Sequence, residues 1–161
     1  MPKVVKPRRS PVNIFIAKDV LFFYEKILLT CESDRKAYGD EKILKESAQI
    51  VNASTPFDFV YKDFEKELQN PIDNVFYFSA DVKKQNKNKK YSNVVRQWYK
   101  HIRNAFAHNY IRKDNGAYVL EDYFQEQKGK PLKKVMYCRI LSLDEFKDLI
   151  IIVNSKLKEQ L

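Results

Sequence analysis

The residues most able to do chemistry stand together in 101-HIRNAFAHNYI-111, which holds both histidines of the chain, His101 and His108, with Arg103 and Asn104 between them. An imidazole titrates near neutral pH, so it can take a proton from a ribose 2′-OH or give one to a leaving oxygen. A guanidinium can hold the non-bridging oxygens of a phosphate while charge builds on them. These residue types favour cleavage of a phosphodiester without a metal.

Other chemistries have weaker support in the sequence. The chain has no H-E-x-x-H, no closely spaced cysteines and no acidic cluster beside the histidines, although these are the usual signatures of a metal site. A serine or cysteine nucleophile with an adjacent histidine has no local signature either. We therefore expect no metal and no cofactor.

The charge of the chain indicates a polyanionic partner, with nucleic acid first and an anionic membrane second. Thirty Lys and Arg residues against 21 Asp and Glu give a net charge of +9, and such an excess attracts nucleic acid. The candidate RNA-binding residues are Lys83, Lys84, Lys87, Lys89, Lys90, Arg96, Arg112 and Lys113. The alternative for the lysine-rich run 83–90 is a solvated loop that binds nothing.

A helix is predicted over 93–109, with Ser92 as its cap. At about 100° per residue, one arc of this helix is apolar and packs into the protein; it carries Val95, Trp98, Ile102, Ala105 and Phe106. Gln97, His101, Asn104 and His108 share the opposite side, and Arg103 lies on the flank. We expect that polar row to point outward, either into solvent or against a second copy of the chain.

Four further helices follow from periodicity and capping: 12–30, 41–53, 54–69 and 143–160. The third rests on Thr55 as N-cap and Pro56 at the first helical position, and the last on a capping box of Ser142 and Glu145. The apolar run 75-VFYF-78 remains unassigned.

Strand signals appear only after residue 110. Residues 114-DNG-116 are typical of a hairpin turn, and 117–124 and 134–141 have strand composition. The sequence therefore predicts a mainly α protein, a helical bundle with a small antiparallel hairpin or three-stranded insert at about 110–141, before the C-terminal helix.

The remaining segments indicate one cytoplasmic domain. Residues 1–11 are expected to form a flexible basic arm and 12–161 a single domain. No apolar core of a signal peptide follows the basic N-terminus, and no stretch is apolar enough for a membrane span. Cys31 and Cys138 are expected to be buried thiols.

The run Arg103-Asn104-Ala105-Phe106-Ala107-His108 resembles the Arg-polar-x-x-x-His motif of HEPN domains. The resemblance implies a helical bundle, a homodimer that joins two motif helices, and a composite metal-independent endoribonuclease site that leaves a 2′,3′-cyclic phosphate. It also implies a toxin or an antiviral defence effector. Arg103 would bind the scissile phosphate, His108 would act as acid or base, and Asn104 would position them, with His101 and Tyr110 as accessory residues.

Alternatives stay open within the same resemblance. The domain could be a non-catalytic module that binds RNA or protein. It could also be a HEPN toxin, paired with an antitoxin or another defence-system partner, that is silenced by nucleotidyl transfer onto Tyr110. Tyr110 completes the Arg-x4-His-x-Tyr pattern of that subgroup, but the strand insert departs from it. An aromatic that packs at the base of the hairpin is the plainer interpretation of Tyr110.

Overall fold

A five-stranded mixed sheet forms the frame of the protein. The computed structural model describes residues 17–23, 25–26, 41–51, 53–62, 64, 70–79, 94–125 and 127–159. The strands are β1 (Asp58–Lys62), β2 (Val75–Ser79), β3 (Ile111–Asp114), β4 (Ala117–Phe124) and β5 (Lys133–Ile140). Their order is β1-β2-β5-β4-β3, with β1 and β2 parallel and the other neighbours antiparallel.

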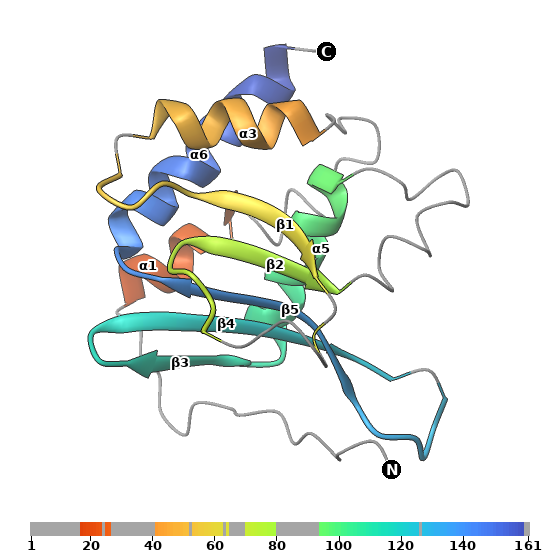
Figure 1. Cartoon of the computed structure of the whole chain (residues 1–161). Coiled ribbons are helices and arrows are strands. Elements are labelled where there is room, and N and C mark those ends of the chain that lie inside the picture. Colours follow the sequence, from red (N-terminus) through yellow and green to blue (C-terminus); the bar gives the residue numbers. More distant parts are fainter. Residues whose placement is uncertain are drawn as a thin grey trace.

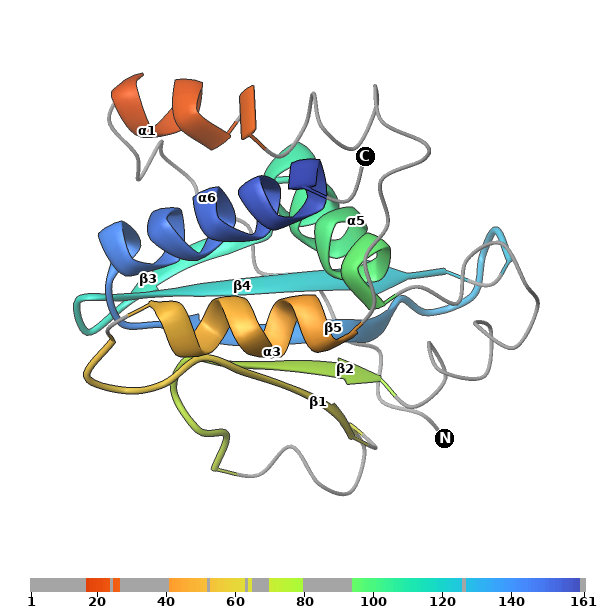
Figure 2. The same ribbon diagram turned by 90° about the horizontal axis from the view of Figure 1, so that it is seen from above.

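Helices pack on one face of this sheet (Figures 1 and 2). The described helices are α1 (Ala17–Phe23), α3 (Glu41–Ile50), α5 (Val94–Ala107) and α6 (Leu143–Glu159). α5 packs on β4, and α3 packs against α6 and the edge strand β1. In Figure 2, α1, α5 and α6 lie on the same side of the strands.

The prediction of a mainly α bundle with strands as a small insert is wrong. The hairpin and β5 join two strands from the first half of the chain, so the sheet is the central layer and not an addition to a bundle. The error began in 54–69, predicted as a helix, where 58–62 is β1. Phe57, Phe59 and Tyr61 alternate at a period of two, and Phe57 and Phe59 are buried, which is a strand pattern.

The unassigned run at 75–78 is β2, whose five residues are all buried. A strand covered on both faces reads as a continuous apolar run without alternation. Phe76 and Phe59 stack on one face of the sheet, with ring centroids 5.4 Å apart, and both rings lie at 89° to the Trp98 ring of α5. Trp98 is fully buried, so this aromatic group joins the sheet to the motif helix.

The second half of the chain follows its sequence signals closely. The hairpin turn between β3 and β4 is Asn115-Gly116, both with positive φ, as a two-residue type I′ turn requires. α6 begins as predicted, because the Ser142 hydroxyl accepts a hydrogen bond from the Glu145 amide at 3.3 Å. Cys138 is a buried free thiol as expected.

Asn74 joins three strands at one end of the sheet. It is fully buried, and its backbone has a positive φ of 63°. Its side chain donates to the Thr55 carbonyl at 2.7 Å and accepts from the Leu141 amide at 3.1 Å. Its backbone amide donates to the Arg139 carbonyl, and its carbonyl accepts from the Asp58 amide. Asparagine tolerates this left-handed conformation better than most residues.

Several predicted features fall partly or wholly outside the described residues. The N-terminal arm 1–11, the lysine-rich run 83–90 and Cys31 lie there. Of the helix predicted over 12–30, the structure describes Ala17–Phe23 as α-helix.

Candidate functional site

The motif helix α5 ends in a turn that fixes the position of His108. The Tyr110 amide donates to the Ala105 carbonyl at 2.8 Å, and the Asn109 amide donates to the Phe106 carbonyl at 3.3 Å. Asn109 has φ 58°. These features define a Schellman motif with Asn109 at the left-handed position. His108 is therefore the last residue before the chain reverses into β3, and its side chain is exposed.

His101 pairs with a carboxylate that the sequence analysis did not single out. Its Nδ1 lies 2.7 Å from Oδ2 of Asp122 on β4, and the two side chains are 7% and 3% exposed. Because an ionised carboxylate only accepts hydrogen bonds, we assign the proton of this contact to Nδ1. The Nε2 atom is buried and has no hydrogen-bond partner within the described residues.

Asp122 also organises the first two residues of the motif. The Asn104 side chain donates to Asp122 Oδ2 at 3.2 Å, and the Arg103 guanidinium donates to Asn104 Oδ1 at 3.1 Å. The other carboxylate oxygen, Oδ1, accepts from the Tyr123 amide at 2.9 Å. A chain of hydrogen bonds thus runs from a buried carboxylate through Asn104 to the half-buried Arg103. We call Arg103, Asn104, His101 and Asp122 the α5 network.

The prediction that Gln97 and His101 point outward is wrong. Both are buried, 7% and 6% exposed, and His101 contacts Asp122 of β4 and the Phe78 ring of β2. In a bundle that side would face away from the core, whereas here β4 runs across it (Figure 1). Only the C-terminal part of the row remains accessible, where Asn104 is half-buried and His108 is exposed.

An aromatic chain connects His108 to a second buried carboxylate. The His108 ring stacks on Tyr110 with centroids 5.4 Å apart, and Tyr110 meets Tyr123 edge to face at 5.1 Å. The Tyr123 hydroxyl donates to Glu121. Tyr110 is 6% exposed, and its carbonyl accepts from the Glu121 amide, so it packs at the base of the hairpin.

Glu121 is neutralised by two cations. Its side chain is 3% exposed and forms ion pairs with Arg112 and, at 2.8 Å, with Lys134. A buried carboxylate without such partners would be costly. Arg112, expected to bind RNA, therefore has a structural partner on β4, and the neighbouring Lys113 is exposed with its ammonium 5.7 Å from the Tyr118 ring centroid.

The side chains of the other expected RNA-binding residues lie outside the described part of the structure. Lys83, Lys84, Lys87, Lys89 and Lys90 lie outside the described residues. Arg96 belongs to α5, but its side chain is also outside the described part.

Asp122 and Glu121 are the residues that the sequence analysis missed. The signal was their position, because two adjacent acids interrupt 117-AYVLEDYF-124, a run otherwise typical of a buried strand. Adjacent residues of a strand point to opposite faces of the sheet, so each acid needed polar partners on its own face. The α5 network supplies the partners of Asp122, and Arg112 with Lys134 supplies those of Glu121.

Burial and ion pairing shift the pKa of three groups on β5. Burial raises the pKa of the Cys138 thiol well above its ordinary value, and the Asp73 charge adds to that shift. Burial also raises the pKa of Tyr137. Hydrogen bonds from Arg139 to Asp73 and Asp114 raise the pKa of the Arg139 guanidinium.

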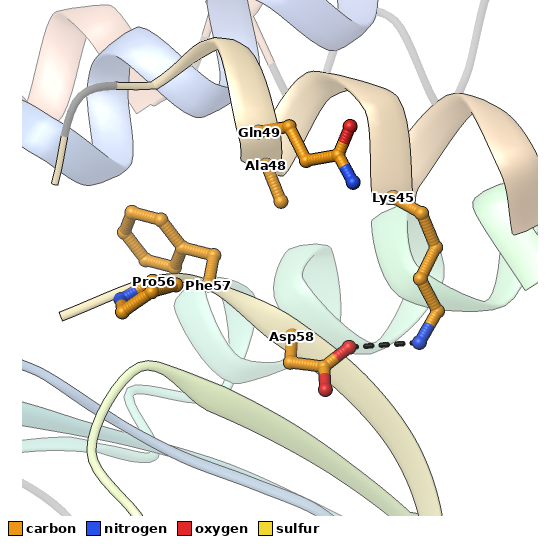
Figure 3. Close-up of a pocket in the computed structure, with 6 residues that line it drawn as sticks. All are labelled: Lys45, Ala48, Gln49, Pro56, Phe57 and Asp58. Atoms are coloured by element: carbon orange, nitrogen blue, oxygen red, sulfur yellow. Dashed lines mark hydrogen bonds and ion pairs between the residues drawn. The ribbon is translucent and has the colours of Figure 1, made fainter.

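A small cavity lies between α3 and β1, away from the motif residues. It has a volume of about 260 Å³, and Figure 3 shows the side chains that line it. Lys45 and Asp58 form an ion pair across its edge at 2.8 Å, while Ala48, Pro56 and Phe57 supply apolar walls. Because its two charged groups neutralise each other, the cavity offers less chemistry than the end of α5.

Within the described residues, no group of three or more His, Cys, Asp or Glu side chains is arranged to hold a metal ion. A search of the same residues also finds no helix with the length and apolar character that a bilayer crossing demands. Comparison of the chain with models of known protein families, with curated proteins and with solved structures gives no match.

Proposed function

We propose that the chain is a metal-independent endoribonuclease whose site lies at the C-terminal end of α5. One observation carries the proposal: the α5 network holds Arg103 through Asn104 and a buried carboxylate, five residues before an imidazole that stays exposed. A guanidinium fixed in advance loses less conformational entropy when it binds phosphate. The net charge of +9 supports RNA as the substrate.

The chemistry follows from the half-buried Arg103 and the exposed His108. The 2′-oxygen of a ribose attacks the adjacent phosphorus, and the bond from phosphorus to the 5′-oxygen of the next nucleotide breaks. An imidazole accepts the 2′-OH proton, and a second acid gives a proton to the departing 5′-oxygen. Arg103 holds the non-bridging oxygens as negative charge grows on them. The products are a 2′,3′-cyclic phosphate and a 5′-hydroxyl.

This reaction favours a homodimer. It is served best by both an acid and a base, yet the chain has only two histidines and one of them, His101, is buried. A second copy would bring a second His108 to the same phosphate. The contact between the copies would use the end of α5, since the Gln97 and His101 side of the helix is covered by the sheet.

The site, and not the fold, supports this function. The sheet-centred architecture differs from the bundle implied by the HEPN resemblance, so the resemblance now rests on Arg103 to His108 alone. Function is argued from the geometry of a site, because one fold serves many chemistries. A toxin or an antiviral effector remains the proposed biological role.

Cleavage of mixed cellular RNA in EDTA tests the proposal. We expect wild-type protein to cut, His108→Ala to lose about 10²–10⁴-fold in rate as general acid–base catalysis is removed, and Arg103→Ala to lose about 10²–10³-fold. Lys42→Ala on α3 removes an exposed charge far along the chain from the motif and should cut normally. Cleavage that persists in folded His108→Ala would refute the proposal.

The second candidate is an RNA-binding module without catalysis, favoured by the charge of the chain. Salt-sensitive RNA binding with no product after long incubation would support it. Nucleotidyl transfer onto Tyr110 is less favoured, because that residue is buried under His108 and Tyr123.

A further inference from the structure

We infer that the tip of the β4–β5 hairpin is a binding platform for single-stranded RNA, which delivers the strand to the end of α5. The hairpin tip is Phe124, Gln125 and residues 127–134. This inference rests on the proposed function for its substrate, but its binding test does not depend on catalysis.

The hairpin tip projects beyond the sheet in both views of the molecule (Figures 1 and 2). Two hydrogen bonds order it: the Gln125 side chain donates to the Lys130 carbonyl at 2.8 Å, and the Lys130 amide donates to the Gln127 carbonyl at 3.0 Å. Gly129 supplies the positive φ, 92°, that the turn requires. The projecting segment is therefore held in a defined shape before any partner binds.

Its composition suits a nucleic-acid strand. Lys128, Lys130 and Lys133 are exposed, and the sequence from 125 to 134 contains four lysines and one acid. Phe124, at the base of the tip, is 42% exposed. Ammonium groups that follow a phosphate backbone, together with an aromatic ring that stacks on a base, are the usual elements of single-strand binding.

The hairpin tip begins at the end of a strand that borders the candidate site. Phe124 ends β4, which carries Asp122 of the α5 network and Tyr123, whose ring contacts Tyr110. Lys134 is anchored to the buried Glu121 and lies 5.5 Å from the Tyr137 ring centroid. An RNA strand bound along the tip would pass from the lysines over Phe124 toward the exposed imidazole of His108. A single exposed aromatic ring also suits a base better than a membrane, which is bound through a larger apolar face.

The test is the affinity of the full chain for a short single-stranded 2′-O-methyl RNA, measured by fluorescence anisotropy at several salt concentrations. The 2′-O-methyl group prevents cleavage. For Lys128→Ala/Lys130→Ala/Lys133→Ala we expect the salt dependence to fall by about 2 in slope and the affinity by up to about 100-fold at 0.1 M salt. Phe124→Ala should weaken binding at least about fivefold with an unchanged slope.

The matched control, Lys42→Ala/Lys45→Ala/Lys156→Ala, removes the same charge from α3 and α6 and should bind almost as wild type. Circular dichroism establishes that each variant is folded. Equal losses in the two triple variants, or no binding by wild type, would overturn the inference. So would tighter binding to phosphatidylserine vesicles than to RNA, because a membrane would then be the partner. If the protein binds RNA as expected but does not cleave it, the proposed function is wrong and the inference about binding holds.

Discussion

Replacement of Asp122 by alanine should destabilise the protein strongly, because this one side chain accepts hydrogen bonds from three donors. It accepts from His101 Nδ1 at 2.7 Å, from the Asn104 side chain at 3.2 Å and from the Tyr123 amide at 2.9 Å. Its residue is 2% exposed, so water cannot readily replace it. A buried group that loses its partner costs about 1–3 kcal/mol, and the half-buried Asn104 side chain costs less than the buried His101. Because the three share one partner, their costs do not add fully, and we expect a total loss of about 3–5 kcal/mol.

The assay is denaturant unfolding of wild type, Asp122→Ala, Asp122→Asn and Asp148→Ala. Asp122→Asn keeps an acceptor oxygen and the side-chain shape, and we expect it to lose about 1–2 kcal/mol, as the bonds to a charged acceptor weaken. Asp148 is exposed on α6, and its replacement should change the free energy of unfolding by less than about 0.5 kcal/mol. A loss of under about 1 kcal/mol in Asp122→Ala would refute the assignment of Asp122 as the anchor of the α5 network.

Four further outcomes can be checked on the same material. Asn74→Ala should cost about 2–4 kcal/mol in denaturant unfolding, since two side-chain hydrogen bonds and the preference for positive φ are lost, and Asn74→Gly should recover about 1 kcal/mol of that by restoring the backbone conformation. Asn109→Val should lower stability by about 1–2 kcal/mol while Asn109→Gly stays near wild type; equal melting temperatures would contradict the left-handed position. Burial raises the pKa of Cys138, so its peptide should stay unalkylated at pH 8 by mass spectrometry until denaturant is added. Glu121→Ala should leave two cations beside an apolar strand and cost about 2–4 kcal/mol, with Glu121→Gln intermediate.

The sequence predicted the local elements of the second half of the chain well. α5, the Asn115-Gly116 turn and α6 each carry a signal within a few residues: a helical period, a left-handed turn pair and a cap. Such signals act through the backbone of the segment itself, so they need no knowledge of the tertiary structure.

The prediction for the first half of the chain was wrong where two local signals in the sequence favoured different structures. Thr55 and Pro56 are typical of a helix start, whereas Phe57, Phe59 and Tyr61 alternate like a strand. The pairing of β1 with β2 favours the strand over the helix. It aligns Asp58 with Val75, which lies 17 residues further along the chain. A long-range partner of this kind leaves no trace in a single sequence.

The candidate site was predicted in its residue types and mistaken in its surroundings. The helical periodicity separated the apolar and polar faces of α5 correctly. It could not show that the polar face also packs against the sheet. Sheet strand β4 covers it, and Asp122 satisfies His101 and Asn104 there. Buried polar groups at a sheet–helix contact are visible only once the partner strand is placed.

The most direct measurement of the central claim is the metal-free cleavage rate of wild-type chains mixed with a large excess of His108→Ala chains. If two copies of His108 act on one phosphate, a ninefold excess of the variant leaves about a tenth of the wild-type chains paired with each other, so the rate per wild-type chain should fall to about a tenth. A rate per wild-type chain that does not change, or no cleavage by wild type alone, would contradict a site shared between two chains.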